Sequence, residues 1–472
     1  MTEESWHEAR LIPTSGISGS EEQERRATSA LLAVLTAVRE FGRAVTQPLG
    51  APAGTVQAFI EVPFTLGDKR VYPDGLIRVS RGQRTWTALV EVKTGNNELS
   101  VEQLENYLDV ARDHGFDALL TISNEIPPAA GQHPTKVDKR KLRKVALHHL
   151  PWNHILAQAV VQKEHRGVAD PDQAWILGEL IRYLEHPRSG ALEFEDMGGS
   201  WVAVRDAVKT GTLRASDKGA AEVAARFDAL LRYVSLRLGR TLGTEVVPAV
   251  TRKEVAEPAL RTSALVDGLT KEGRLSGAIR IPNAVAPLNI ELDLRSGCVT
   301  CLVEIDAPRE GRPTTRINWL VRQLKTAPES LRVEAFAAHA RGLSTASLLK
   351  EVREDPAVLV QDPKRDLRSF RIAVTTPLGP KRGRGRGGAI DSVIDAVDTF
   401  YAEVIQHLKA WTAAPPKMRE VAGLPEADAA LISTALSSQD GIDAVESRAA
   451  AAEEASGLLD DVNSTMPEAS ET

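Results

Sequence analysis

The stretch that decides the fold is Tyr72-Pro73-Asp74-Gly75, followed one hairpin later by Val90-Glu91-Val92-Lys93-Thr94-Gly95. Residues 71–80 and 85–93 have the apolar and β-branched composition of strands. Arg81-Gly82-Gln83 between them is typical of a tight turn. The sequence therefore predicts two antiparallel strands, with the aspartate opening the first and the glutamate and lysine closing the second.

Alternation along the second strand separates apolar from charged side chains. Glu91 and Lys93 are predicted to share one face, while Val90 and Val92 pack on the other. Because the strands are antiparallel, the carboxylate of Asp74 is expected beside that of Glu91. Two neighbouring carboxylates repel each other unless a cation lies between them, and hard oxygen ligands favour Mg²⁺ or Mn²⁺. Lys93 would then hold a water or neutralise charge on a phosphorane-like transition state.

The elements on either side of this hairpin continue in a regular order. They are a helix over 21–41, a strand over 55–66, a helix over 100–113, and strands over 117–122 and 144–150. The predicted fold class is therefore α/β, in the order helix, three antiparallel strands, helix, strand. Two more helices are expected near 152–165 and 171–186.

Both flanking helices add candidates to the site. Gln103 and Tyr107 lie four residues apart and share a helix face. Gln103 is expected to hydrogen-bond toward the catalytic face, and Tyr107 to orient a phosphate or its water. On the first helix, the apolar stripe directs Glu24 inward as an optional third carboxylate. Glu21, one turn earlier, is the alternative.

With its Pro-Asp-Gly, its Glu91-Val92-Lys93 strand and the glutamine and tyrosine of the next helix, the segment 20–150 resembles the PD-(D/E)XK nuclease superfamily. It is most similar to the RecB-like and the very-short-patch or restriction-like branches. The resemblance implies a restriction-endonuclease-like core and metal-dependent hydrolysis of phosphodiester bonds, in DNA more often than in RNA. It assigns metal binding to Asp74, Glu91 and Glu24, catalysis to Asp74, Glu91 and Lys93, and accessory roles to Gln103 and Tyr107.

Two other interpretations of the same residues are kept. Glu91 and Lys93 also suit a solvated strand face, although Leu89, Val90 and Val92 favour a strand buried on at least one side, where an unpaired acid is costly. The fold also serves as a catalytically inactive platform. The alternative function is therefore a scaffold that binds nucleic acid or another protein.

A second, α+β domain is predicted over residues 197–411, after a first domain over 1–196. It is expected to recognise a ligand or to regulate the first domain, and a regulatory protein partner is one candidate. Its expected elements are a helix over 216–238, strands over 277–281, 288–294, 298–305 and 367–375, and helices over 317–325, 343–352 and 390–411.

A basic loop precedes the last of these helices. Four cations, Lys381, Arg382, Arg384 and Arg386, are spaced by glycines. Such a loop is expected to be flexible, so that each cation can meet a phosphate of a nucleic acid. A mobile basic loop without a ligand is the simpler interpretation, and the sequence does not decide between them.

Composition limits the remaining classes. Of a total net charge of −6, residues from Thr412 onward carry −9, which leaves about +3 for the rest. Residues 412–472 are predicted to be a disordered acidic tail, either a solubilising extension or an internal mimic of nucleic acid. Two cysteines exclude a disulfide framework, and no apolar run approaches the roughly 18 residues of a membrane span. A cytoplasmic protein is expected, in bacterial genome defence or repair by analogy of fold alone.

Overall fold

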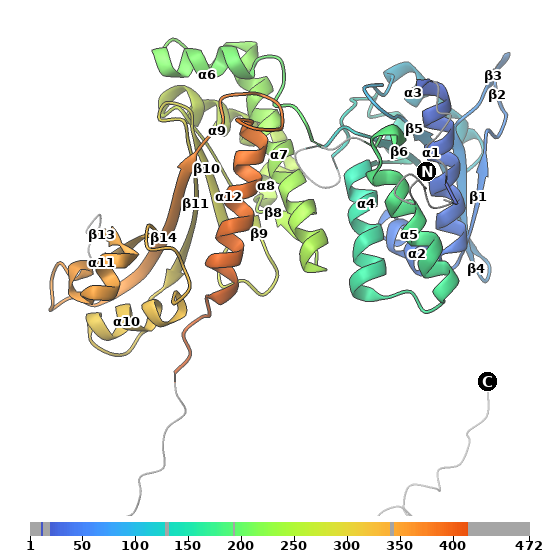
Figure 1. The fold of residues 1–472 in the computed structure, drawn as a ribbon. Coiled ribbons are helices and arrows are strands. Elements are labelled where there is room, and N and C mark those ends of the chain that lie inside the picture. The colour runs from blue at the N-terminus through green and yellow to red at the C-terminus, as the bar shows by residue number, and fades with distance from the viewer. Residues whose placement is uncertain (1–10, 13–18, 128–131, 192–193, 340–343, 414–472) are drawn as a thin grey trace, which may run out of the picture. The chain divides into compact units, whose positions relative to one another are not determined.

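Two separate sheets organise the residues that the computed structural model describes, which are 11–12, 19–127, 132–191, 194–339 and 344–413 (Figure 1). The described residues up to Thr412 belong to one compact unit. The predicted acidic tail lies outside the described residues from residue 414 onward. The first sheet carries the predicted site.

The first sheet is mixed. Its strand order is β1-β4-β5-β6-β7, in which β1, β4 and β5 are antiparallel and β5, β6 and β7 are parallel. The parallel half requires a crossover, and a helix supplies it between β5 and β6. The bounds are β1 (Thr55–Ile60), β4 (Gly75–Arg81), β5 (Arg84–Val92), β6 (Ala118–Ser123) and β7 (Ala146–Pro151).

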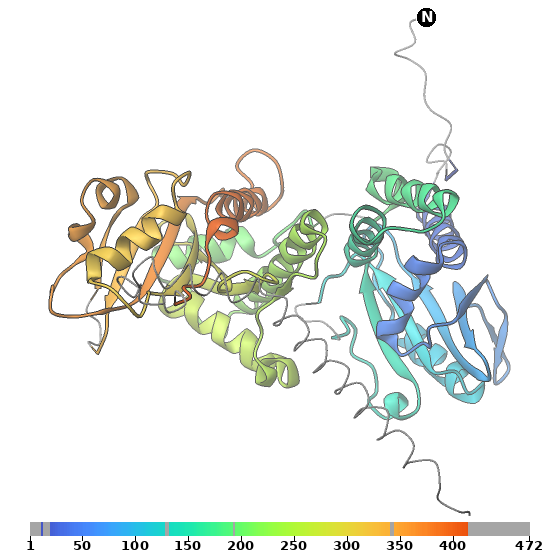
Figure 2. The same ribbon diagram turned by 90° about the horizontal axis from the view of Figure 1, so that it is seen from below.

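Helices cover both faces of this sheet. One core joins the sheet to α1, α2, α4 and α5, and the other joins it to the crossover helix α3. Figure 2 shows the blue and green helices of the first group together on one side of the strands. The bounds are α1 (Ser20–Ala37), α2 (Arg39–Thr46), α3 (Val101–Asp113), α4 (Trp152–Val160) and α5 (Pro171–Glu185).

The alternation predicted for β5 is confirmed. Val90 and Val92 lie in the core beneath α1 and α4, whereas Leu89 packs in the core beneath α3. Glu91 follows Leu89 by two residues and therefore lies on the α3 face. The strand is buried on both faces, so the interpretation of Glu91 as part of a solvated face is wrong.

Residues 55–66 do not form the single strand that was predicted. Glu61 adopts a left-handed φ of 51°, which ends β1. The chain then forms a separate ribbon of β2 (Phe64–Leu66) and β3 (Lys69–Val71) before it enters β4. The amide of Glu61 donates to the carbonyl of Asp74 at 3.2 Å and closes the excursion. The aspartate is thus held at the neck of a loop rather than within a long hairpin.

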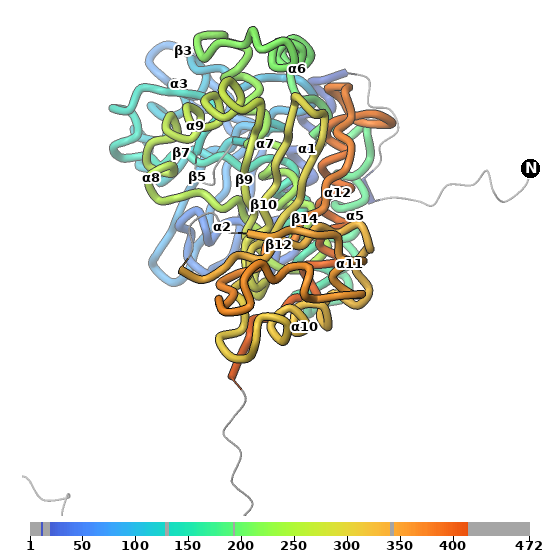
Figure 3. The backbone as a smooth tube through the Cα atoms, turned by 90° about the vertical axis from the view of Figure 1, so that its left-hand side faces the viewer, coloured from blue at the N-terminus to red at the C-terminus, as the bar shows by residue number. Residues whose placement is uncertain are grey.

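The second sheet is antiparallel, with the order β13-β12-β14-β11-β10-β9-β8, and part of it can be followed in Figure 3. Its inward side chains form a third core with α7, α9 and α12. The strand bounds are β8 (Val247–Pro248), β9 (Arg274–Arg280), β10 (Leu288–Asp293), β11 (Cys298–Asp306), β12 (Arg332–Ala337), β13 (Ser344–Leu348) and β14 (Leu367–Pro377). The helices are α6 (Trp201–Thr210), α7 (Lys218–Leu242), α8 (Arg252–Ala256), α9 (Pro258–Lys271), α10 (Pro313–Gln323), α11 (Leu349–Glu354) and α12 (Ala389–Glu403).

Two helices predicted in this region need correction. The first half of the helix expected over 343–352 is the strand β13, because residues 344–348 pair with β12, and the helix α11 begins only at Leu349. The helix expected over 390–411 ends at Glu403. The residues beyond it form a short 3₁₀ turn whose Ile405 is buried in the core.

Ala191 still packs against a core of the first sheet, whereas the residues from Phe194 onward belong to the core of the second sheet. Phe194 and Met197 already pack in the third core, with α7 and the second sheet. No helix within the described ranges is long and apolar enough to cross a membrane.

Candidate active site

The aspartate and the glutamate of the predicted site meet at one end of the β4–β5 hairpin. Gly75 pairs with Val90, so the residue before β4 comes beside Glu91. The amide of Val92 donates to Oδ2 of Asp74 at 2.7 Å. This bond fixes one carboxylate oxygen of Asp74, and its carboxyl group also lies within hydrogen-bonding reach of that of Glu91.

Lys93 joins the carboxylates of two different elements. Its Nζ donates to Oε1 of Glu91 at 2.6 Å and to Oε1 of Glu24, on α1, at 3.1 Å. The indole nitrogen of the buried Trp152 donates to the carbonyl of Lys93 at 2.9 Å, and the amide of Lys93 donates to Ile122 on β6. The backbone that carries the ammonium group is therefore held from both sides.

Burial makes these charges expensive and shifts their pKa values. The side chain of Glu91 is 1% exposed. Its burial, together with repulsion from Asp74, raises the pKa of Glu91 to about 8. Burial likewise raises the pKa of Asp74, against the hydrogen bond from Val92 and the charge of Lys93. Burial alone would lower the pKa of Lys93, but Glu91 and then Glu24 raise it above its ordinary value. The lysine is therefore cationic at neutral pH.

Of the two acids considered on α1, Glu24 is the one that reaches the cluster. Its other oxygen lies 3.4 Å from Nδ2 of Asn97. Glu21 is largely exposed and pairs with Arg25 at 3.0 Å. The apolar stripe of α1 explains the difference, because Thr28 and the residues a turn apart from it face the sheet.

Gln103 and Tyr107 form hydrogen bonds that lead to the segment before Asp74. The hydroxyl of Tyr107 donates to the carbonyl of Tyr72 at 3.0 Å, and Nε2 of Gln103 donates to that hydroxyl at 3.2 Å. The ring of Tyr107 is buried, and burial raises its pKa to about 12. The expectation that Tyr107 orients a phosphate directly therefore gives way to a positioning role, in which it holds the segment before Asp74.

Loss of this hydroxyl should have a measurable cost. We expect Tyr107→Phe to lower the free energy of unfolding by about 1 kcal/mol, because it removes a hydrogen bond and leaves the carbonyl of Tyr72 without its donor. Urea unfolding measures the change. Tyr183→Phe is the matched control, because Tyr183 is also buried but its hydroxyl has no hydrogen-bond partner. Equal destabilisation of the two variants would contradict the positioning role.

The oxygen atoms of the cluster fit a hard divalent cation. Within the part of the chain that the structure describes, Oε2 of Glu91 is a buried oxygen that receives no hydrogen bond from an N–H or O–H donor, and the carboxyl group of Asp74 lies beside it. Carboxylate oxygens are the ligands that Mg²⁺ and Mn²⁺ prefer. Within the described residues, however, no three acidic, histidine or cysteine side chains are already gathered around one point. The ammonium group of Lys93 lies between Glu24 and Glu91 and keeps these two carboxylates apart.

The cluster opens into a cleft with a volume of about 490 Å³. The cleft is bounded by the first turns of α1, the end of β1, the end of the β2–β3 ribbon and the start of α3. Trp152, Asn97 and Tyr72 contribute to the site although the sequence pattern did not single them out. Each of the three contacts the site through a hydrogen bond to a residue far away in the sequence. The resemblance covers Tyr72 as a neighbour of Asp74, but assigns it no role.

No family model matches the chain, and neither a curated protein nor a solved structure is similar to it at a significant level. The residues of the cleft themselves indicate which chemistry is possible there. Lys93 pairs there with Glu24 from α1 and with the buried Glu91 from the end of β5, and Asp74 from the segment before β4 lines the same cleft. Paired carboxylates next to a fixed cation are suited to metal-assisted hydrolysis of a phosphate ester.

The basic loop makes contacts with itself and with neighbouring carboxylates. The amide of Lys381 donates to Gly387 at 2.9 Å, which closes the loop on itself. Arg382 pairs with Asp196 at 3.3 Å, and Arg384 pairs with Asp391 at 3.0 Å. These carboxylates already neutralise part of the loop's charge. Lys381 and Arg386 are exposed, and contact of the loop with a nucleic acid stays a prediction.

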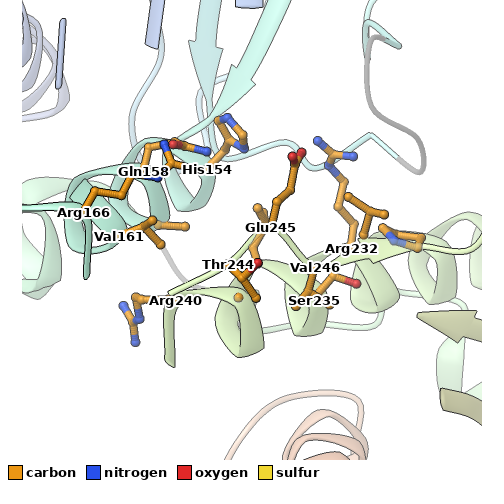
Figure 4. Close-up of a pocket in the computed structure, with 15 residues that line it drawn as sticks. His154, Gln158, Val161, Arg166, Arg232, Ser235, Arg240, Thr244, Glu245 and Val246 are labelled. Carbon is orange, nitrogen blue, oxygen red and sulfur yellow. The ribbon is translucent and has the colours of Figure 1, made fainter. Parts of the chain in front are cut away.

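A second pocket is lined by α4 and α7 (Figure 4). Burial, together with the charge of Arg232, lowers the pKa of His154 to about 4. Glu245 is the one carboxylate among the described residues that line this pocket. Without a second oxygen ligand of this kind, the pocket lacks the set of groups found around Lys93.

Proposed function

We propose that the first domain is a metal-dependent nuclease with a restriction-endonuclease-like core, which hydrolyses phosphodiester bonds, in DNA more readily than in RNA. The observation that carries the proposal is that Asp74, Lys93 and Glu24 line one cleft, while the buried Glu91 pairs with Lys93 directly behind it. The order of α1, the antiparallel strands β1, β4 and β5, the helix α3 and the parallel strand β6 supports it, because the resemblance implies the same order.

Asp74, Glu91 and Glu24 would hold the divalent cation. When bound, Mg²⁺ or Mn²⁺ supplies charge stabilisation at the phosphate and makes a bound water easier to deprotonate. The carboxylates of the chain position the attacking water against the phosphorus. The water oxygen bonds to phosphorus, its proton leaves to solvent, one P–O ester bond breaks, and the departing oxygen takes up a proton.

Lys93 has one defined part in this scheme. In the metal-free cluster, Glu91 and Glu24 accept hydrogen bonds from its Nζ and raise its pKa. The ammonium group would donate hydrogen bonds to the non-bridging phosphate oxygens as their negative charge grows. Its main-chain contacts with Trp152 and Ile122 hold that donor in place before substrate binds.

The proposal is tested with plasmid, linear duplex and single-stranded DNA and RNA, each with Mg²⁺, Mn²⁺ or EDTA. We expect cleavage by the wild type that EDTA abolishes and that Asp74→Ala lowers at least about 100-fold. Asp68→Ala, on the turn of the β2–β3 ribbon, is the control and should leave cleavage unchanged. Cleavage that persists in EDTA, or in a folded Asp74→Ala protein, would overturn the proposal.

The second candidate function is a non-catalytic scaffold. One observation favours it: Lys93 already pairs with two of the carboxylates, which gives the cluster a stable arrangement without a cation. A scaffold would bind nucleic acid equally well in Mg²⁺ and in EDTA and would cut nothing. The second domain is proposed to bind a regulatory protein or to contact nucleic acid through its basic loop, in a bacterial cytoplasmic setting of genome defence or repair.

A further inference from the structure

Two apolar side chains form an exposed rim on the cleft that contains Asp74 and Lys93. Tyr72 and Ile60 are each 52% exposed, and both line this cleft. They come from different segments, the end of the β2–β3 ribbon and the end of β1. Exposed apolar side chains are ordinary when single, but two that border the same cleft beside a charged cluster point to a ligand with an apolar surface.

The backbone that carries the aromatic ring is fixed although the ring is not covered. The hydroxyl of Tyr107 donates to the carbonyl of Tyr72, and Pro73 restricts the chain immediately after it. On the other side, the bond between Glu61 and the carbonyl of Asp74 closes the same loop. The ring is thus presented in one place without being buried, as a binding platform requires.

The charges of the cleft disfavour a ligand that depends on phosphate contacts alone. Among its described lining residues the acids are Glu21, Glu24, Glu61 and Asp74, and the cations are Arg25 and Lys93. Proteins that bind duplex DNA draw much of their affinity from cations that neutralise its phosphates. One bound divalent cation would only balance the two additional acids, so the cleft offers the phosphates little net positive charge.

We propose that the ring of Tyr72 stacks on an unpaired base next to the phosphate that is cleaved, with Ile60 in van der Waals contact with the same nucleotide, so that the substrate is single-stranded or has an unpaired end. The inference rests on the proposed nuclease function. Stacking on an aromatic ring is available only to a base that has left its duplex, and it contributes affinity without a phosphate contact. Tyr72 is therefore a specificity-determining residue, and Tyr107 is the residue that positions it.

The test measures binding and cleavage separately, on a single strand and on the duplex of the same sequence. Binding is measured with the full-length Lys93→Ala protein, from the fluorescence of a 2-aminopurine base in the oligonucleotide. Adding Tyr72→Ala should weaken binding of the single strand about tenfold, whereas Tyr72→Phe should retain it. Trp175→Ala is the matched control, because Trp175 is also exposed, at 56%, but lies on α5 and does not line the cleft.

Cleavage distinguishes this inference from the function on which it rests. In the Lys93-containing protein we expect Tyr72→Ala to lower single-strand cleavage about tenfold more than cleavage of the intact duplex. Equal losses on both substrates, or an effect of Trp175→Ala as large as that of Tyr72→Ala, would overturn the stacking role while leaving the nuclease in place. Absence of metal-dependent cleavage on every substrate, by contrast, would defeat the proposed function itself. If Tyr72→Ala fails to fold, Tyr72→Leu provides the same comparison without an aromatic face.

Discussion

Lys93→Ala should lower the rate of phosphodiester cleavage by about 1000-fold while the protein stays folded. The ammonium group is the one cation that contacts both Glu91 and Glu24, and it is held beside the phosphate position before the reaction begins. Removal of a fixed donor of this kind typically costs two to three orders of magnitude in rate. Single-turnover cleavage at saturating Mg²⁺ measures the loss, and circular dichroism verifies the fold.

Lys141→Ala supplies the control for this loss. Lys141 is also partly buried and paired with a carboxylate, that of Asp109 at 2.5 Å, but it lies outside the cleft. We expect cleavage by this variant to equal that of the wild type. A Lys93→Ala protein that retains more than about one tenth of the wild-type rate would exclude the lysine from the reaction.

Glu91→Gln should change the pH dependence of stability in the metal-free protein. The pKa of Glu91 rises from an ordinary 4.5 to about 8 on folding. The folded state therefore binds more protons than the unfolded state between these values, and stability falls as pH rises through that window. Glutamine carries no charge, so the variant lacks this fall. We expect similar stabilities near pH 5 and an advantage of about 2 kcal/mol for Glu91→Gln above pH 8.

Divalent cations should reverse that advantage. Mg²⁺ or Mn²⁺ offsets the burial cost of the Glu91 carboxylate, so its addition at pH 8 should raise the unfolding temperature of the wild type but not that of Glu91→Gln. Glu102→Gln, at an exposed position of α3 that does not line the cleft, should respond like the wild type. Parallel pH profiles for wild type and Glu91→Gln would show that the carboxylate is not strained, and equal responses to metal would show that it is not a ligand.

The centre of the first domain could be predicted because it depends on local rules. Strand alternation alone separated Glu91 from Val90 and Val92, and the hairpin brought Asp74 to Glu91. The spacing of four residues also put Gln103 on the same helix face as Tyr107, and the two side chains are hydrogen-bonded.

What the sequence did not reveal depends on contacts between distant segments. Pro63 and the Gly67-Asp68 turn are local marks of the break after Ile60, but the composition of residues 64–66 does not show that they leave β1 and pair with β3. Residues 344–348 are a strand because β12 lies beside them, not because of their own propensity. In the same way, nothing near Tyr107 in the chain indicates that its hydroxyl meets the carbonyl of Tyr72.

The side chains that contact the cluster lie between Glu24 and Trp152 in the sequence, and both of these residues are hydrogen-bonded to Lys93. Within the described residues, every side chain assigned to the cleft thus comes from the first third of the chain. On the proposed function, substitutions in residues 197–411 would change what the chain binds without replacing a side chain of the cleft. Selection could then retarget such a chain while the groups around Lys93 stay the same.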